Sequence, residues 1–224
     1  MASVQDLIDF DDPGWPIVEE WINEANSDTT RVTVLPAGSS LERGMALSKV
    51  QVTTRSILGT IIYETGGLLI SHGWLRILGS GSTSFQLPSV PDLSARLGLL
   101  DVSPPKTKRI VIGVDVLGGL FALTNDTQTV HYFAPDLLQW EDLELGYSDF
   151  LQWAMSPRLD RFYLSERWND WQNDVRALNG SQGIHIFPPL FTEKDLPVEQ
   201  RSRKVIPIHE LLSQATLLAG SDPF

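Results

Sequence analysis

The chain has 224 residues and a net charge of −11, from 28 acidic and 17 basic side chains. Because nucleic-acid binding depends on Lys and Arg neutralising phosphates, this balance argues against a nucleic-acid partner. It fits either simple solubility or attraction to a basic protein. The absence of cysteine excludes disulfides, thiolate nucleophiles and cysteine metal sites.

Neither a leader nor a membrane segment is predicted. The N-terminal stretch MASVQDLIDFDD lacks a basic segment followed by an apolar one, so it does not resemble a signal peptide. No apolar run approaches the roughly 18 residues that span a bilayer. The histidines are scattered without the spacing of a helical metal site: His72, His131, His185 and His209. We expect a cytoplasmic, bacterial-type protein with no cofactor, no metal and no membrane partner.

The N-terminal third is predicted to alternate helices with a short strand. Apolar residues at helical spacing indicate a helix over about residues 13–26, opened by Asp12-Pro13. A strand over residues 32–36 follows, ending at Pro36. Ser39 and Glu42 have the spacing of a capping box and open a second helix through about Val50.

The next region is less uniform. Ser56 is suited to cap a helix that stops at Gly66-Gly67, but the β-branched residues between them make a strand nearly as well supported. Residues 68–81 are predicted to form one bent strand or two short ones, interrupted near Gly73. Residues 82–107 are rich in proline and poor in periodicity, which indicates a long surface loop with one helical turn near its middle.

The best-defined prediction is an antiparallel sheet over residues 109–145. Alternate apolar residues from Ile110 to Val116 lie on one strand face, and Arg109, Gly113 and Asp115 on the other. Gly118-Gly119 supplies the positive φ values of a short hairpin turn. Three or four consecutive strands are expected.

Helices are expected to dominate the C-terminal third. The first spans about residues 147–154, and a longer one runs from Leu159 to Leu178 on a stripe that includes Leu164, Trp168, Trp171 and Val175. An edge strand over 184–187, a polar and mobile segment at about 192–204 and a terminal helix over 208–218 complete the chain. Nothing indicates a boundary, so residues 1–224 are expected to form one domain.

Four stretches together resemble one uncharacterised bacterial family. They are QVTTRSILGTIIYETGGLLISHGWLRILGSG, GVDVLGGLFAL, HYFAPDLLQWEDLELGYSDFLQW and RFYLSERWNDW, and the resemblance covers most of residues 10–195. On these motifs the chain is similar to the domain-of-unknown-function family DUF2625. The resemblance implies no particular activity.

A second, more distant resemblance is to the SUKH superfamily. It rests on a Gly-Gly segment leading into a strand, a strand hairpin containing Asp and Gly, and a helix with the sequence Tyr-Ser-Asp-Phe-Leu. This resemblance implies an α+β fold with a mostly antiparallel central sheet flanked by helices. Many bacterial SUKH proteins are immunity proteins that neutralise toxins, and some eukaryotic relatives are interaction modules.

The polar residues of the predicted sheet have structural explanations. Asp115 is expected to bond backbone groups of the Gly118-Gly119 turn or to face solvent, in preference to catalysis. Asp136 follows a proline and is expected to open a turn. Glu141 and Asp142 are adjacent in a strand and point to opposite faces, so they do not form a carboxylate pair for acid/base work.

Aromatic residues provide two further patches. Trp74, Arg76 and His72 are expected to share a strand face, which would form a polar-aromatic patch. Aromatic side chains at helical spacing, as in residues 162–171, more often pack in the core than form a platform for a ligand. The candidate binding residues are therefore Trp74, Arg76, Asp115, Asp136, Trp140 and Glu141, and the sequence indicates no catalytic or metal-binding residue.

No enzyme motif gains support. The segment Gly79-Ser80-Gly81 lacks the spacing of a nucleophile elbow, and neither a dinucleotide fingerprint nor a P-loop is present. We expect a non-catalytic protein-interaction domain with a basic protein partner, and the SUKH resemblance favours the immunity type. The alternatives are a small-ligand binder or enzyme with a cleft near Trp74, Asp115, Asp136 and Glu141, and a homo-oligomeric structural protein. The oligomeric state is left open.

Overall fold

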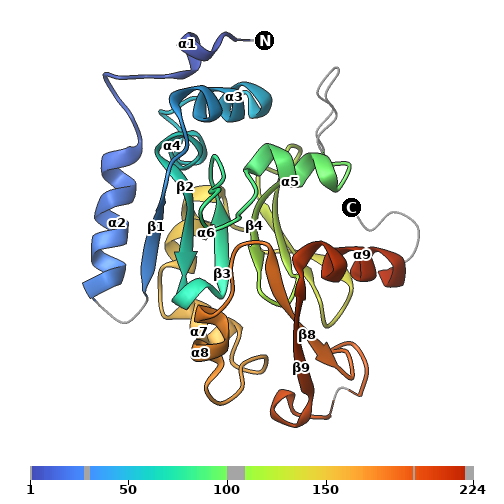
Figure 1. The fold of residues 1–224 in the computed structure, drawn as a ribbon. Coiled ribbons are helices and arrows are strands. Elements are labelled where there is room, and N and C mark those ends of the chain that lie inside the picture. Colours follow the sequence, from blue (N-terminus) through green and yellow to red (C-terminus); the bar gives the residue numbers. More distant parts are fainter. Residues whose placement is uncertain (1, 28–30, 100–108, 194, 220–224) are drawn as a thin grey trace.

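A computed structural model describes residues 2–27, 31–99, 109–193 and 195–219. In this part of the chain an antiparallel sheet of seven strands follows sequence order, each strand pairing with the next (Figure 1). Its strands are β1 (Val32–Pro36), β2 (Thr65–Ile70), β3 (Leu75–Leu78), β4 (Arg109–Asp115), β5 (Leu120–Thr124), β6 (Val130–Ala134) and β7 (Gln139–Asp142). A second, two-stranded antiparallel sheet contains β8 (Gln182–Phe187) and β9 (Ser202–Pro207).

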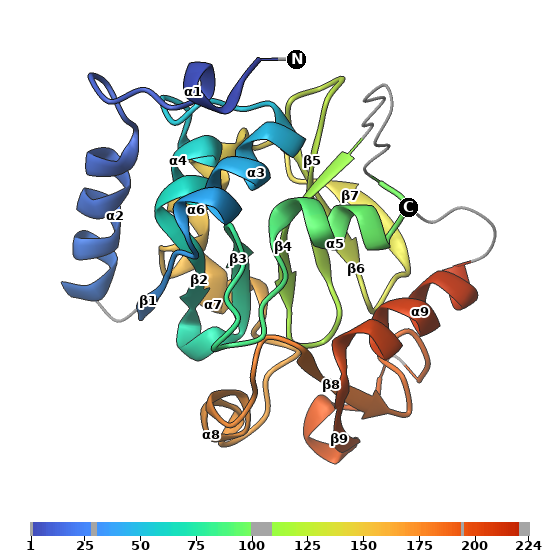
Figure 2. The same cartoon turned by 45° about the horizontal axis from the view of Figure 1, so that its top comes forward.

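Helices cover both faces of the large sheet. In Figure 2, α5 lies in front of β4, α6 and α7 lie behind the sheet, and α2 stands beside the edge strand β1. The helices are α1 (Val4–Leu7), α2 (Trp15–Ser27), α3 (Ser40–Val50), α4 (Ile57–Glu64), α5 (Val90–Arg96), α6 (Tyr147–Ala154), α7 (Arg158–Phe162), α8 (Trp171–Arg176) and α9 (Ile208–Ala219). The fold class is therefore α+β, as predicted, with an antiparallel sheet between helical layers.

Buried apolar residues form one cluster that extends from Leu7 to Leu212. The middle strand β4 contributes to it from both faces, because every residue from Ile110 to Asp115 is buried. A strand that is buried on both faces has a nearly continuous run of apolar residues, whereas a half-exposed strand alternates apolar and polar residues. The division into domains stays a prediction.

Local signals placed the first helices correctly. The Ser39 hydroxyl accepts a hydrogen bond from the Glu42 amide while the Glu42 carboxylate accepts from the Ser39 amide, so the expected capping box is present. Ser56 caps α4 through the Gly59 amide, which decides for a helix over a strand. α2 begins at Trp15, two residues after the expected Pro13.

Gly66 and Gly67 lie inside β2 instead of stopping a helix. A Cβ at Gly66 would lie 2.5 Å from the Pro36 carbonyl oxygen, and Gly67 has a φ of 142°. Glycine is therefore required where β1 and β2 approach most closely, and α4 passes directly into the strand. The following segment forms two strands, β2 and β3, which the 3-10 turn η1 (Ser71–Gly73) separates. This confirms the prediction of two short strands over that of one bent strand.

The helical turn predicted near the middle of the loop over residues 82–107 is present, but it is a helix of seven residues whose apolar side is buried rather than exposed at the surface. This helix, α5, is capped by Ser89, and Val90 and Leu93 pack in the core. Proline at the start of a helix is tolerated because its missing N–H would have no helical partner, which explains Pro91 within α5. Residues 100–108 lie outside the described part.

The single helix predicted over residues 159–178 is also wrong. Two short helices, α7 and α8, replace it, and Asp170 between them has a φ of 62°, which a helix does not allow. Leu164, predicted as core, is 75% exposed. Trp168 is buried against Trp74 instead, so tertiary packing has overridden the helical spacing.

The segment predicted to be polar and mobile at 192–204 contains the 3-10 turn η2 (Val198–Gln200) and the start of β9. Its order depends on Arg201, which is 4% exposed. The guanidinium donates to the carbonyls of Pro188, Pro189, Thr192, Glu193 and Leu196. One buried cation therefore closes the whole loop onto β9, which a polar sequence pattern does not reveal.

Replacing this cation is expected to loosen the loop. Arg201→Met leaves several buried carbonyls without donors, so we expect a loss of about 3 kcal/mol in the free energy of unfolding. Urea denaturation measures the loss. Lys204→Met on the same strand is the control, because Lys204 is exposed, and it should change stability by less than about 0.5 kcal/mol. Equal stability of the two variants would contradict this role of Arg201.

Candidate functional site

The strongest polar cluster centres on Asp115, which is fully buried at the end of β4. Its Oδ1 accepts hydrogen bonds from the amides of Leu117 (2.9 Å) and Gly119 (2.8 Å). Its Oδ2 accepts from the phenols of Tyr132 (2.9 Å) and Tyr163 (3.0 Å). The predicted bond to the hairpin turn is confirmed, and the alternative that Asp115 faces solvent is wrong because the sheet is covered on both faces.

The turn is shaped to receive this carboxylate. Gly118 has a φ of 88°, and a Cβ on Gly119 would overlap Asp115 Oδ2. Tyr132 reaches the carboxylate from β6, where its ring stacks on Phe121 of β5 at 4.6 Å. The site therefore requires glycine in the turn, and it joins β4, β6 and the end of α7.

The four donors offset much of the cost of burying a charge. Burial raises the pKa of Asp115, while the bonds from Gly119, Tyr132, Tyr163 and Leu117 lower it. Burial and the neighbouring carboxylate hold the pKa values of both tyrosines well above 10. Both phenols therefore stay protonated at neutral pH and act as donors, which suits a structural carboxylate.

A second acid, Glu166, lies near this cluster. Burial, together with the charges of Asp115 and Asp136, raises its pKa to about 8, although the charge of Arg167 lowers it. Its Oε2 is buried and has no hydrogen-bond partner in the described part of the chain. Glu166 therefore holds a proton at neutral pH. Glu166 was not among the predicted residues, because it lies in a turn that the apolar spacing assigned to a helix.

Trp74 and Arg76 are interior residues as well. Arg76 is 1% exposed, and its Nη1 donates to the Gln182 carbonyl at 2.6 Å. Burial lowers its pKa to about 10, against the raising effect of Asp115. Trp74 is fully buried among Tyr163, Trp168 and Trp171. Neither side chain has surface to offer a ligand.

The expected patch of His72, Trp74 and Arg76 does not form on a strand face. His72 lies in η1 with a φ of 62° and accepts a bond from Arg176, outside the strands. Arg167 occupies the neighbouring surface instead, with its guanidinium 4.1 Å from the Trp171 ring centroid and 2.6 Å from Asp160. These contacts hold α8 against η1.

The other three candidates lie towards the edge of the large sheet. Asp136 is in the turn between β6 and β7, as predicted, and it is partly buried. Trp140 packs against Phe133, and the guanidinium of Arg109 lies 4.7 Å from its ring. Glu141 is exposed. The six candidates therefore do not meet at one surface, and a binding role for Asp136, Trp140 and Glu141 stays a prediction.

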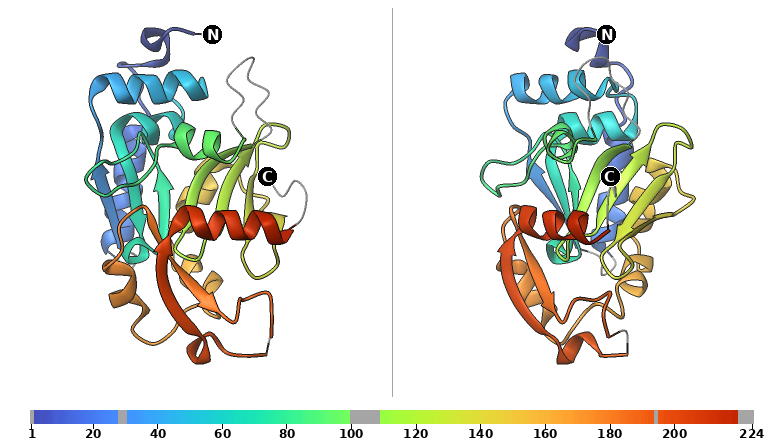
Figure 3. Two further views of the ribbon diagram at one scale, coloured as in Figure 1. Left: turned by 45° about the vertical axis from the view of Figure 1, so that its right-hand side comes forward. Right: turned by 90° about the vertical axis from the view of Figure 1, so that its right-hand side faces the viewer.

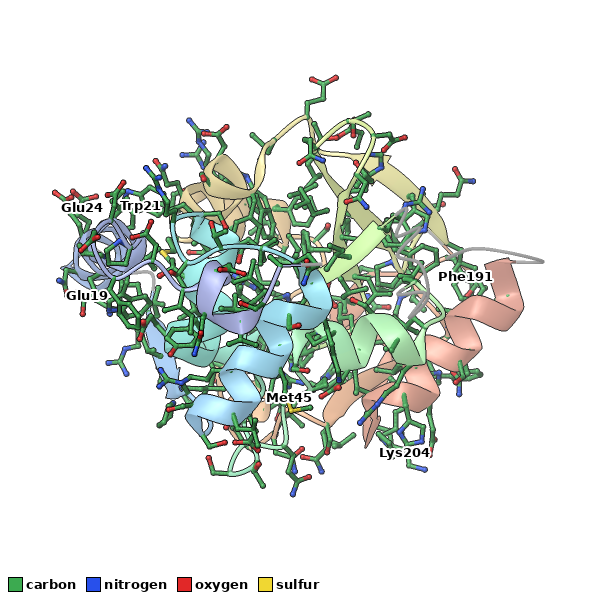
Figure 4. All side chains as sticks on the ribbon, turned by 90° about the horizontal axis from the view of Figure 1, so that it is seen from above. Glu19, Trp21, Glu24, Met45, Phe191 and Lys204 are labelled. Carbon is green, nitrogen blue, oxygen red and sulfur yellow. The ribbon has the colours of Figure 1, made fainter. Side chains whose placement is uncertain are left out.

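A large groove lies elsewhere. Its volume is about 1250 Å³, and it runs between α3, the 80–89 loop, α5 and the start of α9. Both apolar and charged side chains line it, among them Met45, Lys49, Leu87, Asp92, Arg96 and His209. Met45 is 49% exposed and projects from α3 (Figure 4). The sequence did not indicate this groove, because its walls come from four separated segments.

The negative charge is concentrated at the N-terminus. Eight of the 28 acidic residues and none of the 17 basic ones lie in residues 1–30, so this segment carries −8 of the net −11. Asp12 pairs with Arg55 at 3.0 Å, but Glu19 and Glu20 form no ion pair within the described residues. Glu19 and Glu24 project outward from α2 (Figure 4).

Apolar side chains are exposed in the same region. Phe10, just before α2, is 82% exposed, and Ile17 on α2 is 48% exposed. We call these residues, with Asp11, Glu19, Glu20 and Trp21, the acidic face. Exposed apolar groups within a field of one charge are typical of an interaction surface.

The family model described as "Protein of unknown function DUF2625" matches residues 4–211. The chain belongs to this family. It is 40% identical over 217 residues to a putative uncharacterized protein, YbfG, of Escherichia coli K12, with 94% of each chain covered. It is 33% identical over 221 residues to an uncharacterized protein of Haemophilus influenzae, covering 93% of this chain and 91% of the other. The more distant SUKH resemblance stays a prediction.

Two properties of this family member follow from the described residues alone. None of its described helices is both long and apolar enough to cross a bilayer. No three His, Asp or Glu side chains among the described residues are placed to hold a metal ion together.

The proton on Glu166 has a measurable consequence. Between its ordinary pKa of 4.5 and the folded value of about 8, the folded state binds a proton that the unfolded state has lost. Stability therefore falls as pH rises through this window. Glu166→Gln removes this dependence, so from pH 5 to pH 8 the variant should gain about 3 kcal/mol relative to the natural protein.

Urea denaturation at several pH values measures the difference. Glu144→Gln is the control, because Glu144 is exposed and its removal should leave the pH profile unchanged. A Glu166→Gln profile parallel to that of the natural protein would show that Glu166 is ionised in both states.

Proposed function

We propose that this protein is a non-catalytic, cytoplasmic protein-interaction domain of the immunity type, which binds and masks a basic toxin. The observation that carries the proposal is the acidic face. It places Asp11, Glu19 and Glu20 together with the exposed side chains of Phe10 and Ile17 in a segment, residues 1–30, that carries −8. Charge of one sign speeds the approach of an oppositely charged partner, and buried apolar groups then slow its release.

The SUKH resemblance supports the immunity-type role, since many bacterial SUKH proteins neutralise toxins. The asymmetry of charge supports a basic partner more directly. Beyond residue 30 the remaining 20 acidic and 17 basic residues nearly balance. Attraction to a basic protein would therefore come from one end of the chain and not from its average composition.

Affinity capture from the source organism, followed by mass spectrometry, tests the proposal. The natural protein is expected to retain one basic protein in near-stoichiometric amount. The triple variant Asp11→Lys, Glu19→Lys, Glu20→Lys should retain at least about tenfold less of it, because three attractive charges become repulsive.

A matched control separates the acidic face from net charge. The variant Glu144→Lys, Asp149→Lys, Glu210→Lys changes the net charge equally at exposed positions elsewhere. It should retain the partner. The proposal fails if both triple variants lose it equally, or if the natural protein retains no basic protein.

A small-ligand-binding function is the second candidate, and the groove between α3, α5 and α9 favours it. A volume of about 1250 Å³ accommodates a ligand of drug size or larger. Thermal shift against a metabolite library should then identify a compound that raises the Tm. Met45→Trp fills part of the groove and should abolish that shift, whereas Leu164→Trp, at an exposed position outside the groove, should preserve it.

A further inference from the structure

The strand β9 has one paired edge and one open edge. In an antiparallel pair, the N–H and C=O groups of alternate residues point toward and away from the partner strand. The Ile184 amide of β8 donates to the Val116 carbonyl at 2.7 Å, so it points away from β9. Ile184 lies opposite Val205, and Ile186 opposite Arg203, in an unbroken register. The N–H and C=O groups of Val205 and Arg203 therefore point away from β8.

These outward groups are accessible. Arg203, Lys204 and Val205 are all exposed, and Val205 is 49% exposed. Figure 3 shows β9 on the outer side of β8. Within the described part of the chain, no backbone group accepts from or donates to the outward groups of Arg203 and Val205.

The opposite situation holds at β1, the first edge of the large sheet. There the Asn26 side chain occupies the outward groups of Val32, accepting from its amide at 2.8 Å and donating to its carbonyl at 3.1 Å. Pro36, at the end of the strand, has no N–H to offer. Natural sheets usually block their edges in such ways, since an open edge is a template for another strand.

The charges beside the open edge decide which strand can pair there. The Arg203 guanidinium donates to the carbonyls of Val198 and Arg201 and lies 4.9 Å from the Trp168 ring. Lys204 is exposed and forms no ion pair with any described residue, so its charge is available to a partner. In a second copy pairing through Arg203 and Val205, the two Lys204 side chains would lie directly opposite each other. Like charges in that position destabilise a strand pair, whereas acidic side chains would be attracted.

We propose that the open edge of β9 binds an extended, acidic segment of a partner protein, which adds a third strand beside β9. The segment forms backbone hydrogen bonds with Arg203 and Val205, and a carboxylate of the segment lies near Lys204. This is strand addition, in which the backbone provides affinity and the side chains provide selectivity. The site is separate from the acidic face, and it favours a partner of the opposite charge.

Two capped heptapeptides test the proposal, one alternating glutamate with valine and the other lysine with valine. Titration is followed by the backbone amide NMR signals and hydrogen exchange of Arg203 and Val205. The glutamate peptide should bind at least about fivefold more tightly and slow exchange at both amides. The net charge of −11 predicts the opposite preference, so overall attraction cannot produce this result.

Variants at Val205 isolate the backbone contribution. Val205→Pro removes only an outward N–H, because the bonds to β8 come from Lys204 and Ile206. It should weaken binding at least about tenfold, while Val205→Ala, which keeps the N–H, should weaken it less than about threefold. Unchanged exchange at Lys204 and Ile206 verifies that Val205→Pro keeps the strand.

Lys204→Glu provides a test that does not alter the backbone, and it should reverse the preference between the two peptides. The proposal is overturned if neither peptide slows exchange at Arg203 and Val205, or if the lysine peptide binds more tightly. It is also overturned if sedimentation shows a dimer that Val205→Pro abolishes, because the edge would then belong to a second copy.

Discussion

The buried carboxylate of Asp115 is the contact on which the arrangement of the sheet depends. It accepts two amides from the β4–β5 turn and two phenols, one from β6 and one from the residue after α7. A buried carboxylate is costly unless it is fully bonded, so all four donors have to be in place together. The β4–β5 hairpin, the strand β6 and the helical layer behind the sheet are thereby fixed relative to one another.

The same packing explains why two of the predicted binding residues are absent from the surface. Trp74 and Arg76 pack next to the Asp115 cluster, and both are almost completely buried. Their polar atoms are used to bond carbonyls or lie unpartnered in the interior. Polarity inside the sheet thus stabilises one arrangement, and the surfaces proposed for binding are the acidic face, the groove and the open edge of β9.

The sequence predicted those features that depend on a few neighbouring residues. The Ser39–Glu42 capping box, the Ser56 cap and the Gly118-Gly119 turn each act within a few residues, and all are present. Strand alternation predicted the sheet of residues 109–145 for the same reason. The errors arose where distant contacts decide the conformation. Trp168 is buried as predicted, but it packs on Trp74 from the segment between α7 and α8 and not from one long helix. Arg201 orders a polar loop by bonding five carbonyls.

The candidate site shows this limit most clearly. Sequence alone identified Asp115 and its turn, but it did not identify Tyr132, Tyr163 or Glu166 as neighbours, because β6 and the segment after α7 contribute them from 17 to 51 residues away. It also treated the charge of −11 as one property of the whole chain. The distribution is more informative than the total. Residues 1–30 carry −8, whereas β9 carries Arg203 and Lys204, so opposite charges lie on two separate elements. The two proposed partners differ in charge accordingly.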